Sequence, residues 1–518
     1  MAISKVVYKS SASATPVTWM DATPATAAAA DITAPKTAML ADGVVTTGTG
    51  TGGGGTSVDE KDVNFIDYDG TLLYSYTAQE AQALTALPAN PSHTGLTSQG
   101  WNWTLAQIKS QLTNVGGKVW VGQMYVTTSG KTEIDIELTD SVRLSPVLTI
   151  AVNGTISVDW GDNTTPDTVT GSSLSTRQAP SHTYANTGEY TISISVVSGE
   201  FTFYGSTSYF LLRKTATGNQ SRVYNNCVKA IRIGSNITRL KDYAFYFCTS
   251  LQYVTIPSTI TTIDADVFYN CYSLVSATLP STASSIGTYT FCYCYSLRNV
   301  SIPSNMTSIP SQMFSSCWAL GSVTIPSGVT SIGESVFTDC HTLKTIALPS
   351  GITSLGTSCF YACRNIVDIT LPSSLTSIGA SLLNNCSSLR IVIMPSGVKN
   401  ISNLAFGNCY SLTNVTLSND TETIEGSAFS ACYGIASLTI PSKVTSIGNS
   451  AFSSCYGMKE YHFLPTTVPT AGTTIFSSIV SDCIIYVPYS ADHSILNAYQ
   501  TADNWSTYAT YMQEEPQS

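Results

Sequence analysis

Cysteine is the residue with chemical potential that is most regularly spaced in this chain. A thiol can form a disulfide, bind a metal ion or act as a nucleophile. Cysteines one repeat apart would point in the same direction, which keeps their Cβ atoms too far apart for a disulfide. No repeated His or carboxylate accompanies the regularly spaced cysteines to complete a metal site. We therefore expect free, buried thiols, no metal and no cofactor. Ten of the fourteen cysteines form the column, at intervals of 23 residues: Cys248, Cys271, Cys294, Cys317, Cys340, Cys363, Cys386, Cys409, Cys432 and Cys455.

Two acidic residues near the N-terminal end of the chain are a second candidate for catalysis. Residues 65–72 read FIDYDGTL, which resembles the first motif of haloacid-dehalogenase-type phosphatases. In that family the residue matching Asp67 attacks phosphorus, and the residue matching Asp69 works as acid and base. The family also needs a Lys and a later acidic pair, and too short a stretch follows before the next domain. An Asp-Gly turn between two strands explains the same residues, so phosphatase activity is a remote alternative.

Other catalytic constellations are missing from the sequence. There is no phosphate loop of the GxxxxGK[ST] kind and no HExxH, and the five His are scattered. Paired carboxylates for polysaccharide cleavage are also lacking, because the acidic residues of the repeats are sparse and out of register. We therefore expect that the chain is not an enzyme.

The 23-residue repeat must position whatever site the chain has. An apolar residue, mostly Phe, lies three positions before each periodic Cys, and another lies three positions after it. A short alternating strand such as 254–256 follows and ends at Pro, which lacks the N–H that would extend a ladder. Thr-Ser-Ile-Gly then turns the chain. One coil cannot bury its own apolar face, so neighbours must stack, advancing about 4.8 Å per coil.

The pattern AF..C.SL..VTIPS.VTSIG resembles the BspA-like leucine-rich repeats of bacterial and phage surface proteins. We expect about ten coils over residues 237–460. Residues 201–236 would be a connector and N-terminal cap. In residues 461–518, a last strand at 484–488 and a short helix near 496–499 resemble the terminal cap of such arrays.

A different module precedes the repeats. Residues 158–162 read VDWGD, 182–184 read HTY and 188–192 read GEYTI, which resembles a PKD-type immunoglobulin-like domain. This predicts a β-sandwich over 141–200 that serves as a spacer or faces carbohydrate, without catalysis. Asp162 and Asp167 could hold Ca²⁺, but a turn stabilised by Asp side chains is the favoured interpretation.

Residues 62–140 are expected to form a small α+β domain, with helices near 77–86 and 104–114 and strands at 119–126 and 132–138. Its DYDGT, GWNW and VGQMY segments resemble a module of structural proteins of gut-bacterial phages. Residues 1–47 resemble an element of phage fibres and decoration proteins, and 48–61 form a Gly-rich linker. The fold class expected is therefore multidomain and mainly β.

Composition excludes some partners. Charged residues make up 11%, and a net charge of −10 without a Lys/Arg cluster argues against nucleic acid. No apolar run of 18 residues is present, so we expect no membrane insertion. The start, MAISKVVYKSSASATPV, lacks the apolar stretch of a secretory signal. We expect a soluble chain made in the host cytoplasm without a signal peptide.

These features predict a phage virion protein, a head or tail fibre or decoration protein located at the virion surface. The N-terminal segment would bind other virion proteins, and the repeats would attach to a glycan or protein of the host bacterial surface. A homo-oligomer, as a trimer, is implied by the resemblance alone. The alternative is a bacterial BspA-like cell-surface adhesin.

The binding surface is expected in the column that directly follows the periodic Cys. Aromatic and hydrogen-bonding side chains dominate there and would stack along the array, where they could grip a glycan or protein. A structural aromatic ladder that shields the edge of the coils is the competing interpretation. The candidate binding residues are Tyr272, Tyr295, Trp318, His341, Arg364, Tyr410, Tyr433 and Tyr456.

Overall fold

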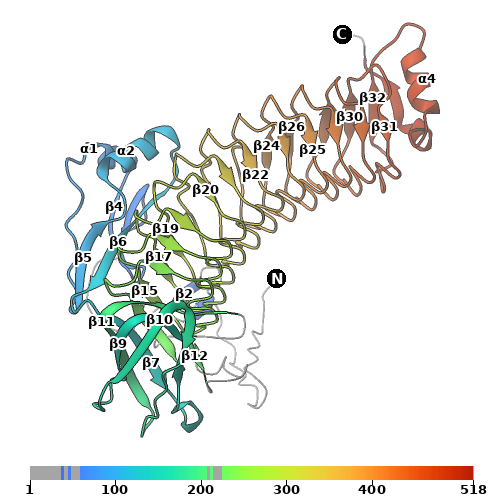
Figure 1. Ribbon diagram of the computed structural model, residues 1–518. Helices are drawn as coiled ribbons and strands as arrows, with labels where there is room; N and C mark the ends of the chain where they lie inside the picture. The colour runs from blue at the N-terminus through green and yellow to red at the C-terminus, as the bar shows by residue number, and fades with distance from the viewer. Residues whose placement is uncertain (1–36, 40–44, 48–58, 207–210, 214–224, 517–518) are drawn as a thin grey trace. The chain divides into compact units, whose positions relative to one another are not determined.

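The computed structural model describes residues 37–39, 45–47, 59–206, 211–213 and 225–516. The chain divides into two compact units, residues 1–57 and 58–518. In the first unit, β1 (Thr37–Met39) pairs antiparallel with β2 (Val45–Thr47). The remainder of the expected virion-anchoring segment, and most of the linker, lie outside the described residues. The second unit is mainly β, as expected, with the repeats wound into a solenoid (Figure 1).

The α+β module forms around a four-stranded sheet in the order β4-β3-β6-β5. Its two short helices are confirmed, and each begins at a capping box, Thr77 with Glu80 and Thr104 with Gln107. Phe65 and Trp101 are central to the small core between helices and sheet. The elements are β3 (Val63–Ile66), β4 (Leu72–Tyr76), α1 (Ala78–Ala83), β5 (Leu96–Trp101), α2 (Leu105–Asn114) and β6 (Val119–Thr127).

The strand at 132–138 belongs to the next sheet and not to the α+β module. This strand, β7 (Thr132–Leu138), pairs antiparallel with β11 on one side and with β13 on the other. Both edges of β6 are already occupied by β3 and β5, so β7 cannot continue the first sheet by pairing with β6. The expected boundary at residue 140 therefore moves to the turn between β6 and β7.

The second sheet is continuous with the solenoid. It has the order β10-β9-β11-β7-β13-β15, and β13 pairs in parallel with β15, the first strand of its kind in the repeats. β8 and β12 pair antiparallel and form a separate two-stranded sheet. The PKD-type likeness of this region stays a prediction. The elements are η2 (Ser141–Arg143), β8 (Val147–Leu148), β9 (Ile150–Asp159), β10 (Asp167–Gln178), β11 (Gly188–Phe203), β12 (Leu212–Arg213), β13 (Val228–Arg232) and β15 (Tyr253–Thr255).

Most coils contribute a first short strand at the Val-Thr-Ile segment. These strands pair in parallel one coil apart, for example Val300 with Ala277, which is an offset of 23 residues. Beyond β15 they are β17 (Ser276–Thr278), β19 (Asn299–Ser301), β24 (Ile391–Ile393), β26 (Asn414–Thr416), β28 (Ser437–Ile440), β30 (Glu460–Phe463) and β32 (Ile484–Val487).

The Thr-Ser-Ile segment, expected as a turn, forms a second parallel strand because its backbone also pairs one coil apart, as Ile263 does with Ile286. The solenoid has about 12 turns of about 23 residues, and its strands continue past the expected limit at residue 460. The second strands are β14 (Arg239–Leu240), β16 (Thr262–Ile263), β18 (Ser285–Ile286), β20 (Ser308–Ile309), β21 (Ser331–Ile332), β22 (Ser354–Leu355), β23 (Ser377–Ile378), β25 (Asn400–Ile401), β27 (Thr423–Ile424), β29 (Ser446–Ile447) and β31 (Thr470–Ala471).

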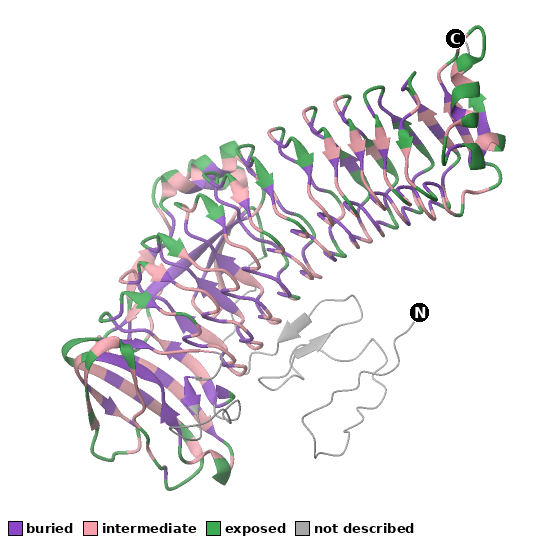
Figure 2. Cartoon of the chain, turned by 45° about the vertical axis from the view of Figure 1, so that its right-hand side comes forward, coloured by how far each residue is buried: buried purple, intermediate pink, exposed green. Residues whose placement is uncertain are grey.

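Stacked Phe rings and thiols fill the solenoid interior, which is buried along the array (Figure 2). Neighbouring rings of the Phe column lie nearly parallel, as with Phe268 and Phe291, whose centroids are 5.3 Å apart. Each periodic thiol from Cys271 onward donates to the carbonyl of the Phe or Leu three positions before the previous periodic Cys, as Cys340 Sγ does to Phe314 O at 3.3 Å. The column thus selects Cys because a small side chain fits there and satisfies a buried carbonyl.

We expect the thiols to be unreactive in the native protein. All fourteen cysteines are buried thiols that form no disulfide, and burial raises their pKa, that of Cys409 to about 12. Because the thiolate is the nucleophile, mass spectrometry after N-ethylmaleimide treatment should find no adduct on the folded chain and adducts on every Cys after denaturation. Labelling of the native periodic cysteines would contradict this packing.

Two residues in every complete coil adopt the left-handed backbone conformation without being glycine. In one coil these are Asp266 and Asn270, with φ of 59° and 62°, and the next coil repeats them at Tyr289 and Tyr293. The conformation lets the backbone N–H groups of this segment bond to the following coil, as Asn270 does to the Cys292 carbonyl. The strain, about 1–2 kcal/mol per residue, is offset by this stacking.

The α+β module is docked on the Val-Thr-Ile face of the first coils. Trp103 Nε1 donates to Ile302 O at 2.8 Å, and Trp120 Nε1 donates to Ser322 Oγ at 2.9 Å. Gly122 lies so close to Thr278 that an added Cβ would be 2.0 Å from its hydroxyl oxygen. Glycine is therefore required there, and the docking is specific to this face.

The C-terminal cap matches the expected strand and helix. After β32 come α4 (Ser494–Thr501), η3 (Ser506–Tyr511) and β33 (Met512–Glu514), which adds to β32 in parallel. Trp505 is buried beneath them and donates to Pro469 O. The cap thus closes the last turn of the array, as an open coil requires.

We expect the cap to loosen at high pH. His462 Nδ1 lies 2.7 Å from Glu515 Oε1, and its Nε2 lies 3.3 Å from Glu460 Oε2. Partial burial lowers the pKa of His462, but these carboxylates outweigh it and raise the pKa. The stabilisation is therefore complete below the unfolded value of about 6.5 and is lost as pH rises through the folded pKa.

Hydrogen exchange of residues 512–514 at about pH 5.5 and about pH 9 checks this expectation, with His462→Gln as the comparison. Protection should fall with rising pH in the native chain and change little in the variant. His493, which pairs with Glu514 at 2.7 Å, remains in both proteins. An equal pH response in the two would contradict the role of His462.

Candidate functional site

The candidate binding residues come together in two stacked runs. Each follows the periodic Cys at the outer corner of a tight turn, which closes, for example, by the bond from Leu274 N to Cys271 O at 3.1 Å. Because this turn recurs in each coil, its corner residues form one row along the solenoid, which we call the stripe. The first run is Tyr272, Tyr295, Trp318 and His341, and the second run is Tyr410, Tyr433 and Tyr456.

Ring spacing in the first run is close to the strand spacing of the coils. The ring centroids of Tyr272 and Tyr295 are 4.9 Å apart, those of Tyr295 and Trp318 are 4.1 Å apart, and those of Trp318 and His341 are 5.6 Å apart. The rings are stacked, with interplanar angles of 19°, 28° and 18°. His341 Nε2 also lies 3.4 Å from Asp339 Oδ1.

The second run is more exposed. Its centroid distances are 4.9 Å between Tyr410 and Tyr433 and 5.4 Å between Tyr433 and Tyr456. Tyr456, at the end of the run, is 53% exposed. Arg364 and Ser387 lie between the two runs and interrupt the stacking, so the stripe is not continuous.

Stacking decides which parts of the rings a partner can reach. Within a run each ring face is covered by its neighbours, so the stripe presents ring edges and tyrosine hydroxyls. An open ring face is left only at the end of a run, as at Tyr456. This geometry suits a long partner that accepts hydrogen bonds at intervals of about 5 Å better than a single sugar lying flat on a ring.

Tyr295 provides a hydroxyl that donates hydrogen bonds in the first run. The pKa of Tyr295 is raised by burial and then by the neighbouring Tyr272, so its hydroxyl remains a donor at physiological pH. The stripe therefore offers hydrogen bonds and apolar ring edges, and Arg364 adds a cation between the two runs.

The acidic residues considered for phosphoryl transfer have structural roles. Asp67 is 3% exposed, and its carboxylate accepts from Tyr125 at 2.8 Å and lies 2.6 Å from His93 Nε2. Asp69 Oδ1 accepts from Thr71 N, and Gly70 N donates to Asp67 O, which closes the expected Asp-Gly turn. A carboxylate held in this way is not poised as a nucleophile.

The acidic residues considered for Ca²⁺ are likewise engaged by protein donors. Asp162 accepts from Thr164 and pairs with His182 at 2.7 Å, and Asp167 accepts from Trp160 Nε1 at 2.9 Å. Among the residues that the structure describes, no group of three His, Cys, Asp or Glu side chains is arranged to hold a metal ion. In the same residues no helix is both long and apolar enough to cross a bilayer.

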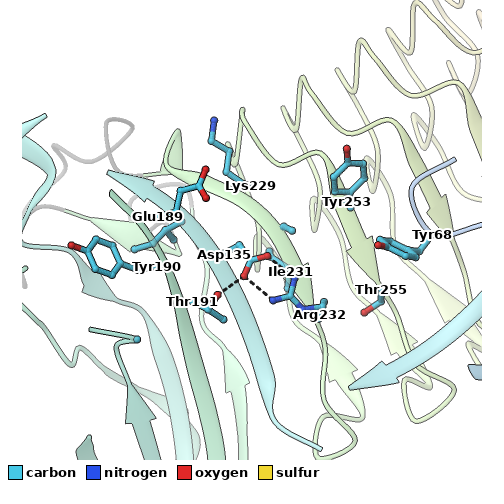
Figure 3. Close-up of a pocket in the computed structure, with 13 residues that line it drawn as sticks. Tyr68, Asp135, Glu189, Tyr190, Thr191, Lys229, Ile231, Arg232, Tyr253 and Thr255 are labelled. Atoms are coloured by element: carbon cyan, nitrogen blue, oxygen red, sulfur yellow. Dashed lines mark hydrogen bonds and ion pairs between the residues drawn. The ribbon is translucent and has the colours of Figure 1, made fainter. Parts of the chain in front are cut away.

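The sequence did not reveal a groove of about 760 Å³ on the second sheet (Figure 3). Its lining comes from β11, β7, β13 and β15 together with Gly161, in the loop after β9, and Tyr68 of the α+β module. These segments are far apart in the chain, and only their pairing brings them together. Strand alternation could have shown which side chains face away from the core, but not that they share a groove.

The family follows from the repeats. The model of the BspA type leucine-rich repeat region matches in six copies, over residues 218–344, 330–459 and 378–499. Together these matches span more than half of the chain. The chain belongs to the BspA-type leucine-rich repeat family. The matched region begins before residue 237 and ends after residue 460, in agreement with the longer array of this BspA-type protein.

Solved structures with similar repeats include a leucine-rich repeat protein from Bacteroides ovatus, 24% identical, covering 56% of this chain and 85% of that chain with a TM-score of 0.45. Another, from Eubacterium ventriosum, is 21% identical, with coverages of 44% and 75% and a TM-score of 0.33. A leucine-rich cell surface protein from Faecalibacterium prausnitzii is 23% identical, with coverages of 47% and 81% and a TM-score of 0.27. No curated protein matches this BspA-type chain.

Proposed function

We propose that this BspA-type protein is a non-enzymatic adhesin that is displayed at a cell surface and attaches through its repeats. The observation that carries the proposal is the stripe of stacked side chains at the outer turns of the array. Tyr410 and Tyr433 are each 43% exposed although they are large and partly apolar. Exposed aromatic residues in a fixed row are typical of interaction surfaces.

Rigid coils support binding by the stripe. The Cys and Phe columns beneath the stripe are fully buried, as at Cys432 and Phe429, so the turns that carry the tyrosines have little freedom to move. A partner then loses little free energy in ordering the protein side of the interface. The acidic residues with catalytic potential, Asp67 and Asp69, are engaged in a turn, which favours binding over catalysis.

A cell-binding assay tests the proposal. The purified full-length chain, fluorescently labelled, is added to cells of the source culture and counted by flow cytometry. Replacing Tyr410, Tyr433 and Tyr456 by Ala together should lower bound protein about tenfold or more. The matched control replaces three exposed lysines of the same part of the array by Ala: Lys399, Lys443 and Lys459. Their surface ion pairs contribute little to the free energy of unfolding.

The control should bind as the native chain does. Equal binding by the tyrosine variant would assign the stripe to the structural ladder and overturn the proposal. Circular dichroism of both variants keeps the comparison on folded protein.

The location of the chain is tested separately. Immunogold labelling and mass spectrometry of cell envelopes and purified particles from the same culture should place the chain on envelopes. The virion location that we expect from the resemblance of the N-terminal modules stays a prediction. Labelling of particles in place of envelopes would establish it and overturn the adhesin.

A further inference from the structure

The groove on the second sheet has walls of different character and a polar floor (Figure 3). Tyr68 and Tyr253 form one wall, with ring centroids 6.2 Å apart in an edge-to-face arrangement. Glu189 and Lys229 lie on the opposite side. The groove thus combines rigid aromatic side chains with hydrogen-bonding groups, as binding sites do.

The floor contains a preformed network of hydrogen bonds around Arg232. Arg232 Nη2 donates to Asp135 Oδ1 at 2.7 Å, and its Nε donates to Glu133 Oε2 at 2.9 Å. Thr191 Oγ1 also donates to Asp135 at 2.8 Å. These bonds fix the guanidinium plane, so a ligand meets donors that are already oriented.

The charges of the groove disfavour an anionic ligand. Arg232 is neutralised by its two carboxylates, and Lys229 pairs with Glu137 at 2.7 Å. Glu189 is exposed and adds a further negative charge. Carboxylates therefore outnumber cations around the groove, and a phosphate, a nucleic acid or an acidic sugar would be repelled.

The backbone of the floor is closed to a peptide strand. β7 is paired with β11 and β13, and β13 is paired with β7 and β15. β7 and β13 therefore have no free edge for main-chain pairing, and in this part of the groove side chains must recognise the ligand. Thr255 also lines the groove; it is 3% exposed, and its buried hydroxyl has no hydrogen-bond partner within the described residues.

From these features we propose that the groove is a binding site for a neutral oligosaccharide. Tyrosine rings contact the apolar faces of sugars, and the guanidinium, carboxylate and hydroxyl groups exchange hydrogen bonds with sugar hydroxyls. This site is separate from the stripe and extends the proposed function by naming a ligand class. It also needs the docked α+β module, because Tyr68 supplies part of one wall.

Titration of the full-length chain with defined sugars tests this inference. The probes are cellohexaose, maltohexaose, mannohexaose and chitohexaose, with hexagalacturonate as the anionic comparison, followed by isothermal titration calorimetry. At least one neutral probe should bind, and Tyr253→Ala should weaken its binding about tenfold. Because Tyr253→Ala also removes the contact with Tyr68, Glu189→Ala on the opposite wall serves as a second variant and should weaken binding as well.

Tyr489→Ala is the matched control, since it removes the same kind of side chain from an exposed position in the C-terminal cap, outside both the groove and the stripe. It should bind the neutral probe as the native chain does. The inference is overturned if no neutral probe binds at millimolar concentration, if hexagalacturonate binds more tightly, or if neither groove variant binds more weakly. Weaker binding by a stripe variant, Tyr433→Ala, alone would assign the sugar to the stripe, which would overturn the groove and leave the proposed function standing.

Discussion

Replacing Phe337 by Ala is expected to lower the free energy of unfolding by about 3–5 kcal/mol. Phe337 is fully buried and lies between Phe314 and Phe360, with ring centroids 5.7 and 5.5 Å away. Each coil contacts mainly its neighbours, so a cavity in the middle of the array weakens the coupling between its two halves. Urea unfolding followed by circular dichroism should show a lower midpoint and two transitions in place of one.

The chain itself shows which substitution the Phe column accepts, and this substitution provides the control. Leu383 occupies the same column as the phenylalanines and is fully buried. Phe337→Leu should therefore cost about half as much as Phe337→Ala and keep one transition, because most of the volume is retained. Equal losses for the two variants would contradict the stacked core.

Trp120→Ala is expected to release the α+β module, at a cost of about 3–5 kcal/mol. Trp120 is 1% exposed, its indole N–H donates to Ser322 Oγ, and its backbone N–H donates to Thr324 Oγ1 at 2.8 Å. Removing the indole leaves a cavity and an unpaired Ser322 in the interface. Hydrogen exchange should rise in β17 and β19, which the module covers, and remain unchanged in β27 and β29.

Trp318→Ala is the matched control for the docking experiment. Trp318 lies only four residues from Ser322 in the chain but is 44% exposed in the stripe. Its removal should change the free energy of unfolding by about 1 kcal/mol or less. A uniform rise in exchange over all coils of the Trp120 variant would show that Trp120 supports the whole array and not the docking alone.

The sequence predicted the solenoid well because its constraint is repeated. A fixed interval between Cys residues, with Phe three positions before, leaves few ways to bury the apolar side chains, and the structure confirms the thiols and the ring column. The rings at Tyr272 and several of its equivalents stack one coil apart, as their constant position relative to the Cys predicts. Whether the stripe binds a partner stays a prediction.

The sequence did not predict how the modules join. The alternation of Ile134 and Ile136 indicates a strand, but it does not show which sheet the strand enters, because pairing depends on which edges are free. For the same reason Tyr68, Asp135 and Arg232 gave no signal of a shared groove. The second strand of each coil was missed because two residues of Ser and Ile resemble a turn as much as a strand.

Docking of the α+β module divides the array into coils of different evolutionary freedom. The coils from β15 to the segment near Ala347, which Gly117 approaches, must keep the small side chains that fit beneath the module. Beyond them the buried contacts between neighbouring coils follow the 23-residue repeat, and coil-specific ion pairs such as Lys399 with Glu422 and Lys443 with Asp420 are exposed. Recombination between coils can therefore insert or delete whole repeats between Ala347 and the C-terminal cap, which changes the reach of the protein while the reading frame and the docked region are preserved.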